Sequence, residues 1–247
     1  MKIILLRHGE SEWNSLNKFT GWTDVDLTLK GIDEAKFSAR QILLHNIAIS
    51  SVNTSLLSRA INTAKIVCEI LNFDKDKIKY NWELNERHYG ALQGLSKSET
   101  ATKYGEDQVH IWRRSYDIPP PKISEEDKRH PKLIDKFRNI NEDLPVGESL
   151  KDVIDRLLPF WKEYSNNLKK GTSNLIVAHS NSLRAIIKIL EEIDDKKISL
   201  VNIPTGIPLV YNLDKNLKVI HKEYLIDDIA LEEKQSLVIN QGKALNR

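Results

Sequence analysis

The chain has 247 residues, 40% apolar and 29% charged, so it is long enough to close one sizeable core and is not disordered by composition. Its 37 Lys and Arg residues nearly balance 35 Asp and Glu residues, and a net charge of +2 gives no indication of nucleic-acid binding. A single cysteine, Cys68, excludes an internal disulfide, and no Cys/His cluster has zinc-ligand spacing. We therefore expect a cytoplasmic protein with no membrane anchor, because the N-terminal apolar run is too short for a signal or a span.

The first quarter of the chain alternates between strand and helix patterns. A continuous apolar run, KIILLRH, predicts a strand buried on both faces and puts His8 at its C-terminal end. Apolar residues at helical spacing predict a helix over 28–46, and a short strand is expected near 47–52. Ser58 is the predicted N-cap of the next helix, which places Arg59 in the first turn.

The middle of the chain is less regular. A strand-like segment near 78–84 precedes a capping-box pattern, Ser96 with Glu99, that predicts a helix, and a second short helix is expected over 108–114. Residues 118–148 combine PPPK with mixed charge and little periodicity, which predicts a loop excursion on the surface. The clearest helix begins at Ser149.

The last third repeats the opening pattern. NLIVAH predicts a second buried strand, which ends at His179 and turns directly into a helix. Two segments, 209–213 and 217–225, predict a hairpin, and residues 226–247 are expected to form a mobile tail. We predict a single α/β domain over 1–247: three layers, with a mostly parallel central sheet flanked by helices on both faces. Such sheets bind ligands at the C-terminal ends of their strands.

The segment RHGES places an imidazole in the turn after the first strand. Arg7 precedes His8, and a neighbouring guanidinium discourages the imidazole from binding a proton. Gly9 permits close approach of a ligand to the backbone. A neutral imidazole is a nucleophile, so His8 could attack phosphorus. The alternative is a histidine that only hydrogen-bonds its own loop.

Other polar residues are predicted to meet His8. Arg7, Arg59 and His179 lie at two strand ends and one helix start, so all three could converge on one phosphoryl group. Helix N-termini near Ser58 and Asn181 would add backbone donors.

A carboxyl group and further cations complete the candidate site. Glu86 follows a predicted strand and could act as general acid and base, although such polar runs are usually solvated turns. Lys97, Arg113 and Arg114 are cations that a site for a neutral molecule would not need; the alternative is a solvated basic face. Carboxylates do not cluster as they do in magnesium sites, so no metal is expected.

Seven ordered segments are distinctive: RHGESEWN (7–14), FTGWTDVDL (19–27), LLSRAINTA (56–64), LNERHYGALQG (84–94), IWRRSYDIPPP (111–121), AHSNSLRA (178–185) and NIPTGIPLVY (202–211). On these segments the chain resembles, nearly end to end, the cofactor-dependent phosphoglycerate mutases of the histidine phosphatase superfamily. RHG alone is shared by many phosphatases, whereas LNERHYGALQG together with the WRR segment is characteristic of the mutases.

The resemblance assigns roles to individual residues. It implies that His8 becomes a phosphohistidine and that Glu86 donates and accepts the proton. His179 would stabilise the transferring phosphoryl group, with Arg7, Arg59 and Asn14 holding it. Contacts to the phosphates and carboxylate of the substrate are expected from the remaining positions: Ser11, Thr20, Gly21, Arg87, His88, Tyr89, Lys97, Arg113, Arg114, Ser180 and Asn181.

The implied activity is interconversion of 3-phosphoglycerate and 2-phosphoglycerate in glycolysis and gluconeogenesis, with 2,3-bisphosphoglycerate as the primer and no metal. A histidine phosphatase that hydrolyses a small phosphate ester is the alternative. A third reading, a catalytically idle phosphate-binding protein, is disfavoured because His8, Glu86 and His179 are all retained. Family members of this length imply a homodimer, with no nucleic-acid or membrane partner.

Two features depart from the family pattern or extend it. The family usually has Gly after the second histidine, where this chain has Ser180, and we expect the serine to be tolerated if only its backbone N–H is used. Residues 122–147 match the family only loosely. That excursion and the tail with its QGK are expected to act as lids that exclude water.

Overall fold

The computed structural model describes residues 1–241 and 243. Its core is one six-stranded sheet with the order β3-β2-β4-β1-β5-β6. The first four strands in this order are parallel, and β5 and β6 run antiparallel at one edge as the predicted hairpin. The strands are β1 (Lys2–Arg7), β2 (Ser51–Thr54), β3 (Ile78–Tyr80), β4 (Ser173–Ala178), β5 (Leu209–Leu213) and β6 (Val219–Tyr224).

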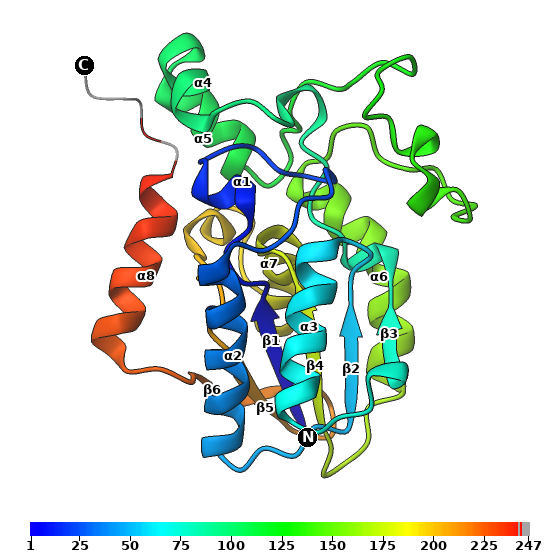
Figure 1. Ribbon diagram of the computed structural model, residues 1–247, viewed down its shortest axis with the longest axis vertical. Coiled ribbons are helices and arrows are strands. Elements are labelled where there is room, and N and C mark those ends of the chain that lie inside the picture. The colour runs from blue at the N-terminus through cyan, green and yellow to red at the C-terminus, as the bar shows by residue number, and fades with distance from the viewer. Residues whose placement is uncertain (242, 244–247) are drawn as a thin grey trace.

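Helices cover both faces of this sheet, which confirms the predicted three-layer α/β fold (Figure 1). The apolar side chains of β1 alternate between two cores, as a strand buried on both faces requires. Ile3 and Leu5 pack in the core formed with α6 and α7, whereas Ile4 and Leu6 pack in the core formed with α2 and α3. The helices are α1 (Glu12–Ser15), α2 (Leu29–Leu44), α3 (Ser58–Ile70), α4 (Lys97–Tyr104), α5 (Glu106–Arg114), α6 (Leu150–Asn166), α7 (Ser180–Glu191) and α8 (Asp228–Asn240).

Several element boundaries differ from those predicted. The second strand begins at Ser51 rather than near 47, and α3 is preceded by Leu57 as its N-cap. Ser58 is therefore the first helical residue, and its backbone amide donates to Asp24 Oδ1 from a distant loop. A carboxylate from a distant part of the chain therefore accepts from a free amide at the start of the helix, where the sequence predicted that a serine side chain would cap it.

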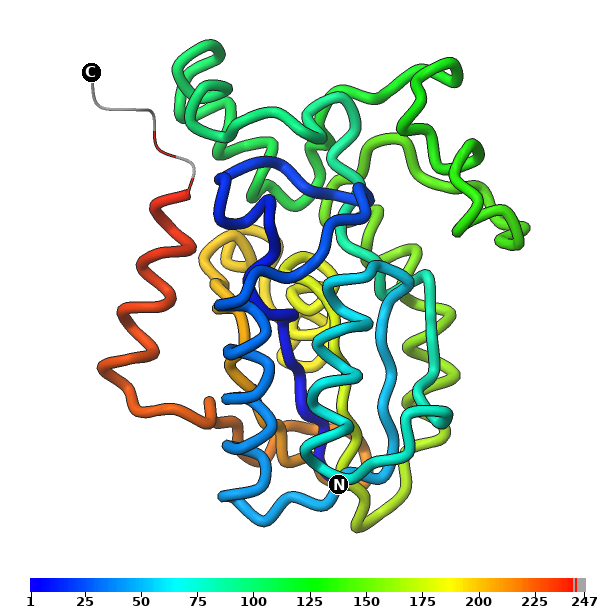
Figure 2. The backbone as a smooth tube through the Cα atoms, viewed as in Figure 1, coloured from blue at the N-terminus to red at the C-terminus, as the bar shows by residue number. Residues whose placement is uncertain are grey.

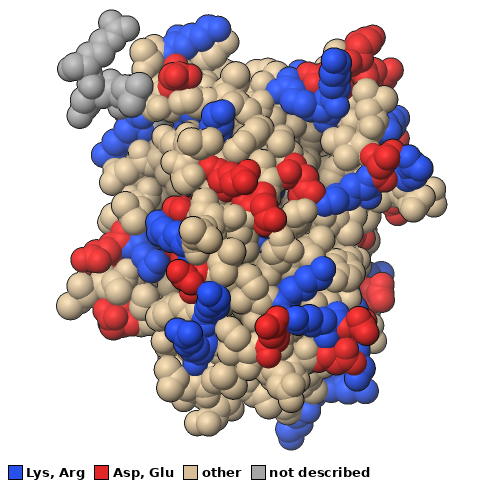
Figure 3. Space-filling view, viewed as in Figure 1, with Lys and Arg blue, Asp and Glu red and all other residues tan. Residues whose placement is uncertain are grey.

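The excursion lies at the C-terminal edge of the sheet, whereas the tail begins near the opposite edge and runs up beside the domain toward it (Figure 2). Residues 118–148 contain only short 3-10 turns, Pro131–Leu133 and Asp135–Phe137, as expected of a loop. The tail contains a helix, α8, capped by the side chain of Asp227; its mobility stays a prediction, and residues 242 and 244–247 lie outside the described part of the chain. Figure 3 shows positive and negative side chains interspersed over one face.

Candidate active site

A cavity lies at the C-terminal ends of β1 and β4, where the sequence placed two histidines. The parallel register pairs Arg7 with Ala178, so the next residue of each strand, His8 and His179, emerges at the same edge. His8 N–H donates to the Ala178 carbonyl at 3.0 Å, and the two imidazole centroids are 4.9 Å apart. The predicted convergence of the two histidines is confirmed.

The contacts of His8 leave one ring nitrogen free of a proton. Nδ1 lies 2.7 Å from the Gly9 carbonyl, which can only accept, so Nδ1 carries the hydrogen and Nε2 holds a lone pair. Arg59 Nε donates to that Nε2 at 3.3 Å. Burial, followed by the charges of Arg59 and Arg7, holds the pKa of His8 well below its usual range. The imidazole is therefore neutral at physiological pH, with Nε2 as its nucleophilic atom.

His179 is a second buried, neutral imidazole. Its Nε2 lies 2.7 Å from Ser55 Oγ, and its Nδ1 has no hydrogen-bond partner among the described residues. Burial lowers the pKa of His179 well below its usual value, and Arg59 and His8 contribute further.

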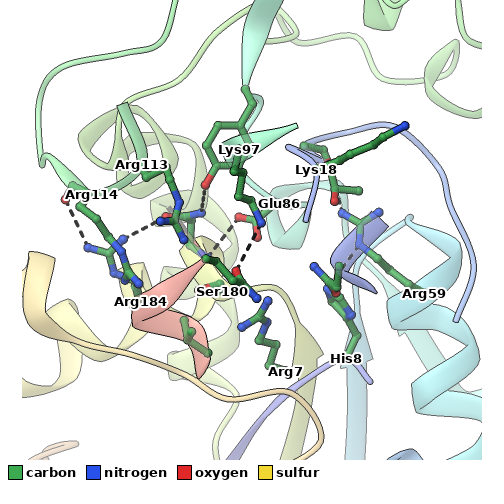
Figure 4. A pocket seen from close by; sticks show the side chains of 17 residues that line it. Arg7, His8, Lys18, Arg59, Glu86, Lys97, Arg113, Arg114, Ser180 and Arg184 are labelled. Atoms are coloured by element: carbon green, nitrogen blue, oxygen red, sulfur yellow. Dashed lines mark hydrogen bonds between the residues drawn. The ribbon is translucent and has the colours of Figure 1, made fainter. Parts of the chain in front are cut away.

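Glu86 supplies the carboxyl group of the cavity (Figure 4). Its Oε1 accepts hydrogen bonds from the backbone N–H of Arg87 at 2.7 Å and of Asn181 at 3.1 Å. The Asn181 amide lies in the first turn of α7, where free N–H groups favour negative charge. The carboxyl is thus fixed by the backbone of two elements and faces the cavity that His8 also lines.

Cations dominate the rest of the wall. Burial and then the charge of Arg113 hold the pKa of Lys97 well below its usual range, and burial lowers the pKa of Arg114 to about 10. So much buried positive charge repels itself until an anion enters, and such a cavity therefore favours a polyanionic ligand. The cationic side chains that line it are Arg7, Lys18, Arg59, Lys97, Arg113, Arg114 and Arg184.

Most predicted site residues meet at this cavity. They are Arg7, His8, Asn14, Thr20, Gly21, Arg59, Glu86, Tyr89, Lys97, Arg113, Arg114, Ser180 and Asn181.

Four predicted residues do not line the cavity. Ser11 caps α1 through Asn14, and His179 lies beneath the wall against Ser55. Arg87 donates to two carbonyls of α5. His88 accepts from the Gly90 amide within its own loop, whereas Arg87 ties that loop to α5.

Sequence reasoning missed Lys18, Arg184, Val238 and Gln241 as lining residues. Arg184 could have been found, because it lies one helical turn after Asn181 and donates to its Oδ1 at 3.1 Å. Gln241 belongs to the predicted QGK lid, and its Oε1 lies 3.3 Å from Lys97 Nζ. Val238 carries no chemical signal in the sequence.

Ser180 does not adopt the left-handed backbone conformation that would require glycine. It begins α7 and faces the cavity. The structure therefore offers no conformational reason against serine at this position.

The buried histidines predict a loss of stability in acid. Burial lowers the pKa of His88 to about 3, and it lowers those of His8 and His179 as well, against an unfolded value of 6.5. Below pH 6.5 the unfolded chain binds more protons, so each histidine should lower the free energy of unfolding as the pH falls, with a slope that approaches about 1.4 kcal/mol per pH unit. Urea unfolding at pH 7.0, 6.0 and 5.5 measures this slope. His88→Asn should reduce this slope by the contribution of one histidine. His221→Asn, at an exposed position, serves as the control. An unchanged slope in His88→Asn would contradict the prediction.

Comparison with known proteins agrees with this geometry. Residues 3–127 and 122–221 match the family model of the histidine phosphatase superfamily (branch 1). A 2,3-bisphosphoglycerate-dependent phosphoglycerate mutase from Treponema denticola is 51% identical over 245 residues, which are 98% of this chain and 99% of that protein.

Solved structures share the fold at lower identity. A mycobacterial glucosyl-3-phosphoglycerate phosphatase, complexed with VO3, has a TM-score of 0.68 at 20% identity and covers 85% of this chain and 92% of its own. A putative alpha-ribazole-5'-P phosphatase from Escherichia coli has a TM-score of 0.63 at 20% identity, covering 87% of this chain and 92% of its own.

The chain therefore belongs to the histidine phosphatase superfamily and, within it, to the 2,3-bisphosphoglycerate-dependent phosphoglycerate mutases. The resemblance inferred from the seven sequence segments is confirmed.

Proposed function

We propose that this enzyme interconverts 3-phosphoglycerate and 2-phosphoglycerate through a phosphohistidine at His8. The observation that carries the proposal is a neutral imidazole whose unprotonated Nε2 shares a cavity with seven cations and one carboxyl group, counted over the described residues. The 51% identity to a phosphoglycerate mutase over nearly the whole chain supports the same substrate pair.

The donor set fits 2,3-bisphosphoglycerate, which carries two phosphates and a carboxylate, because cations outnumber carboxylates so strongly in the cavity. When bound, this primer supplies the phosphoryl group that His8 first receives. Arg7, Arg59 and Asn14 would hold that group, together with His179. Contacts to the rest of the ligand would come from Thr20, Gly21, Tyr89, Lys97, Arg113, Arg114, Ser180 and Asn181, with Ser11, Arg87 and His88 acting through the loops that they support.

The chain's own groups can carry out both half-reactions. His8 Nε2 forms an N–P bond as the P–O bond to the leaving oxygen breaks, and Glu86 gives that oxygen a proton. In the second half-reaction Glu86 takes the proton from the free hydroxyl of a bound phosphoglycerate, whose oxygen forms a P–O bond as the N–P bond to His8 breaks, which regenerates bisphosphoglycerate. Arg7 and Arg59 line the same cavity and would stabilise the charge that spreads over the equatorial oxygens of the phosphoryl group.

Hydrolysis of a small phosphate ester is the alternative function, because water could replace the phosphoglycerate hydroxyl as the acceptor of the phosphoryl group. The cation-rich wall favours the mutase, since a bisphosphorylated species must reorient without leaving. One assay separates the two: purified protein with 3-phosphoglycerate, with and without catalytic 2,3-bisphosphoglycerate, following 2-phosphoglycerate and free phosphate. Primer-dependent 2-phosphoglycerate is the expected result; phosphate as the main product would overturn the proposal, and neither product would indicate a binding protein.

We propose that the tail closes the cavity during turnover. Val238 and Gln241 of the tail line the wall, and Gln241 contacts Lys97. Truncation after Leu225 should raise phosphate release relative to mutase turnover, because water gains access to the phosphohistidine. The ratio of the two products measures the effect, and an unchanged ratio would remove the tail from the mechanism.

The remaining proposals concern the protein as a whole. We propose a single domain that acts in the cytoplasm as a homodimer, without a metal ion. Within residues 1–241 and 243, no group of three metal-ligating side chains occurs and no helix is long and apolar enough to cross a membrane. Sedimentation velocity tests the assembly: a 28.4 kDa species at all concentrations would contradict the dimer.

A further inference from the structure

Arg156 of α6 lies outside the cavity, yet its guanidinium is surrounded by the loop that carries Glu86. Its side chain is 5% exposed and lies near the rings of Trp22 and Trp82, at 5.7 Å and 5.8 Å from their centroids. A buried arginine needs an anion and several acceptors, because an unpaired guanidinium is costly away from water. For Arg156 the anion is the Glu148 carboxylate, and the acceptors are backbone carbonyls of the loop.

The acceptors are carbonyl groups of a short 3-10 turn, Trp82–Leu84, and of the irregular segment that follows it. Arg156 Nη1 donates to the Glu83 carbonyl at 2.6 Å. Its Nη2 donates to the carbonyls of Asn85 at 3.3 Å and of Glu86 at 3.4 Å. Residues 85–89 lie between two 3-10 turns, so these carbonyls would otherwise lack intrahelical or interstrand donors. Trp22 Nε1 also donates to the Glu86 carbonyl, at 2.5 Å.

Glu148 holds the other side of the same loop. Its carboxylate accepts a bidentate pair from Arg156, Nε to Oε1 at 2.7 Å and Nη2 to Oε2 at 3.1 Å. The same Oε2 accepts the backbone N–H of His88 at 2.7 Å, and the Glu148 N–H donates to the His88 carbonyl at 2.9 Å. The pair therefore fixes the main chain both before and after Glu86 and Arg87.

We propose that Arg156 and Glu148 are positioning residues that set where the Glu86 carboxyl lies. Neither lines the cavity, so both act through the backbone. The carboxyl depends on that backbone, because its Oε1 accepts from the amide of the next residue, Arg87, and from Asn181 on α7. A shift of the loop of about 1 Å would misplace the acid-base group relative to the leaving oxygen, which can cost about 100-fold in rate. The inference rests on the proposed role of Glu86.

The test uses full-length protein with Arg156→Lys, which keeps the charge but loses the fork that reaches Glu148 and the carbonyls together. We expect kcat to fall by about 10- to 100-fold while KM for phosphoglycerate changes by less than about threefold. In a Glu86→Gln background the same substitution should cost less than about threefold, because its effect passes through the carboxyl already removed. A role confined to stability would lower the melting temperature and leave kcat per folded enzyme unchanged in both backgrounds.

Arg129→Lys is the matched control. Arg129 also pairs with a carboxylate, Asp127, and donates to the Gln93 carbonyl, but it does not contact the 83–88 segment. Its kcat should stay at the wild-type value. If Arg156→Lys does not fold, Glu148→Gln replaces it, since the amide oxygen can still accept the His88 N–H while the bidentate pair is lost.

Failure of this inference can be told from failure of the proposed function. Normal kcat in folded Arg156→Lys, or equal losses in the wild-type and Glu86→Gln backgrounds, overturns the positioning role. Absence of primer-dependent isomerisation in the wild-type protein overturns the function instead. The same variants are then compared through phosphate release, because Glu86 would protonate the leaving oxygen in that reaction too.

Discussion

Replacing His8 by Ala is expected to lower kcat for phosphoglycerate interconversion by at least about 10⁴-fold, because the attacking atom is removed. The cavity would retain its cations and should still bind phosphoglycerate. Incubation with bisphosphoglycerate labelled in its phosphoryl groups should leave acid-labile phosphate on the wild-type protein and none on the variant. Turnover measured by the primer-dependent assay gives the size of the loss.

The control for this substitution is His45→Ala, at an exposed histidine at the end of α2, which should keep normal turnover and labelling. A His8→Ala protein with wild-type turnover would show that another group attacks phosphorus. Label on that variant at His179 would indicate that the second imidazole is the acceptor. Either result would contradict the assignment of the nucleophile.

Buried strands and strongly periodic helices could be predicted from the sequence, because the pattern of apolar residues in each segment indicates its structure without reference to the rest of the chain. The continuous apolar runs before His8 and His179 predicted two buried strands of a mostly parallel sheet, and the register shows in addition that these strands are neighbours. The boundaries of helices and strands were harder to predict. The start of α3 depends on Asp24, which lies more than 30 residues earlier in the chain, and a local capping pattern cannot contain that contact.

The candidate site was predicted well where a residue's position follows from a strand end or a helix start. His8 and Arg59 are examples, and their Nε2–Nε contact follows from that placement. Lys18 and Val238 were missed because they reach the cavity through loop and tail geometry. Arg156 was missed for a different reason: on the sequence it is one more charge on an amphipathic helix, and only its burial reveals that it serves the loop of Glu86.

The positive charges of the cavity wall repel one another strongly. Desolvation and mutual repulsion lower the pKa of Lys97 and Arg114, so the ligand-free cavity is destabilised by its own charge. A bound polyanion relieves this repulsion, and binding energy from groups remote from the reacting phosphorus can then orient the ligand. Glu86 is the only carboxylate among the described residues that line the cavity, so its replacement should be the substitution most specific to proton transfer.

Glu86→Gln should lower kcat by about 10²- to 10⁴-fold, because glutamine cannot give the leaving oxygen a proton or take one from the attacking hydroxyl. The amide oxygen can still accept from the Arg87 and Asn181 backbone, so the side chain should keep its place and KM should change by less than about threefold. Turnover in the primer-dependent assay and ligand affinity by calorimetry measure the two effects separately.

A substrate whose leaving group needs no proton distinguishes acid catalysis from binding. Release of p-nitrophenolate from its phosphate ester should be slowed far less by Glu86→Gln than phosphoglycerate turnover, since that anion leaves without protonation. Glu83→Gln is the matched control, because its carboxylate lies on the same segment but does not line the cavity, and it should keep normal rates with both substrates. Equal losses with both substrates in Glu86→Gln would mean that the carboxyl group binds or organises the site rather than moving the proton.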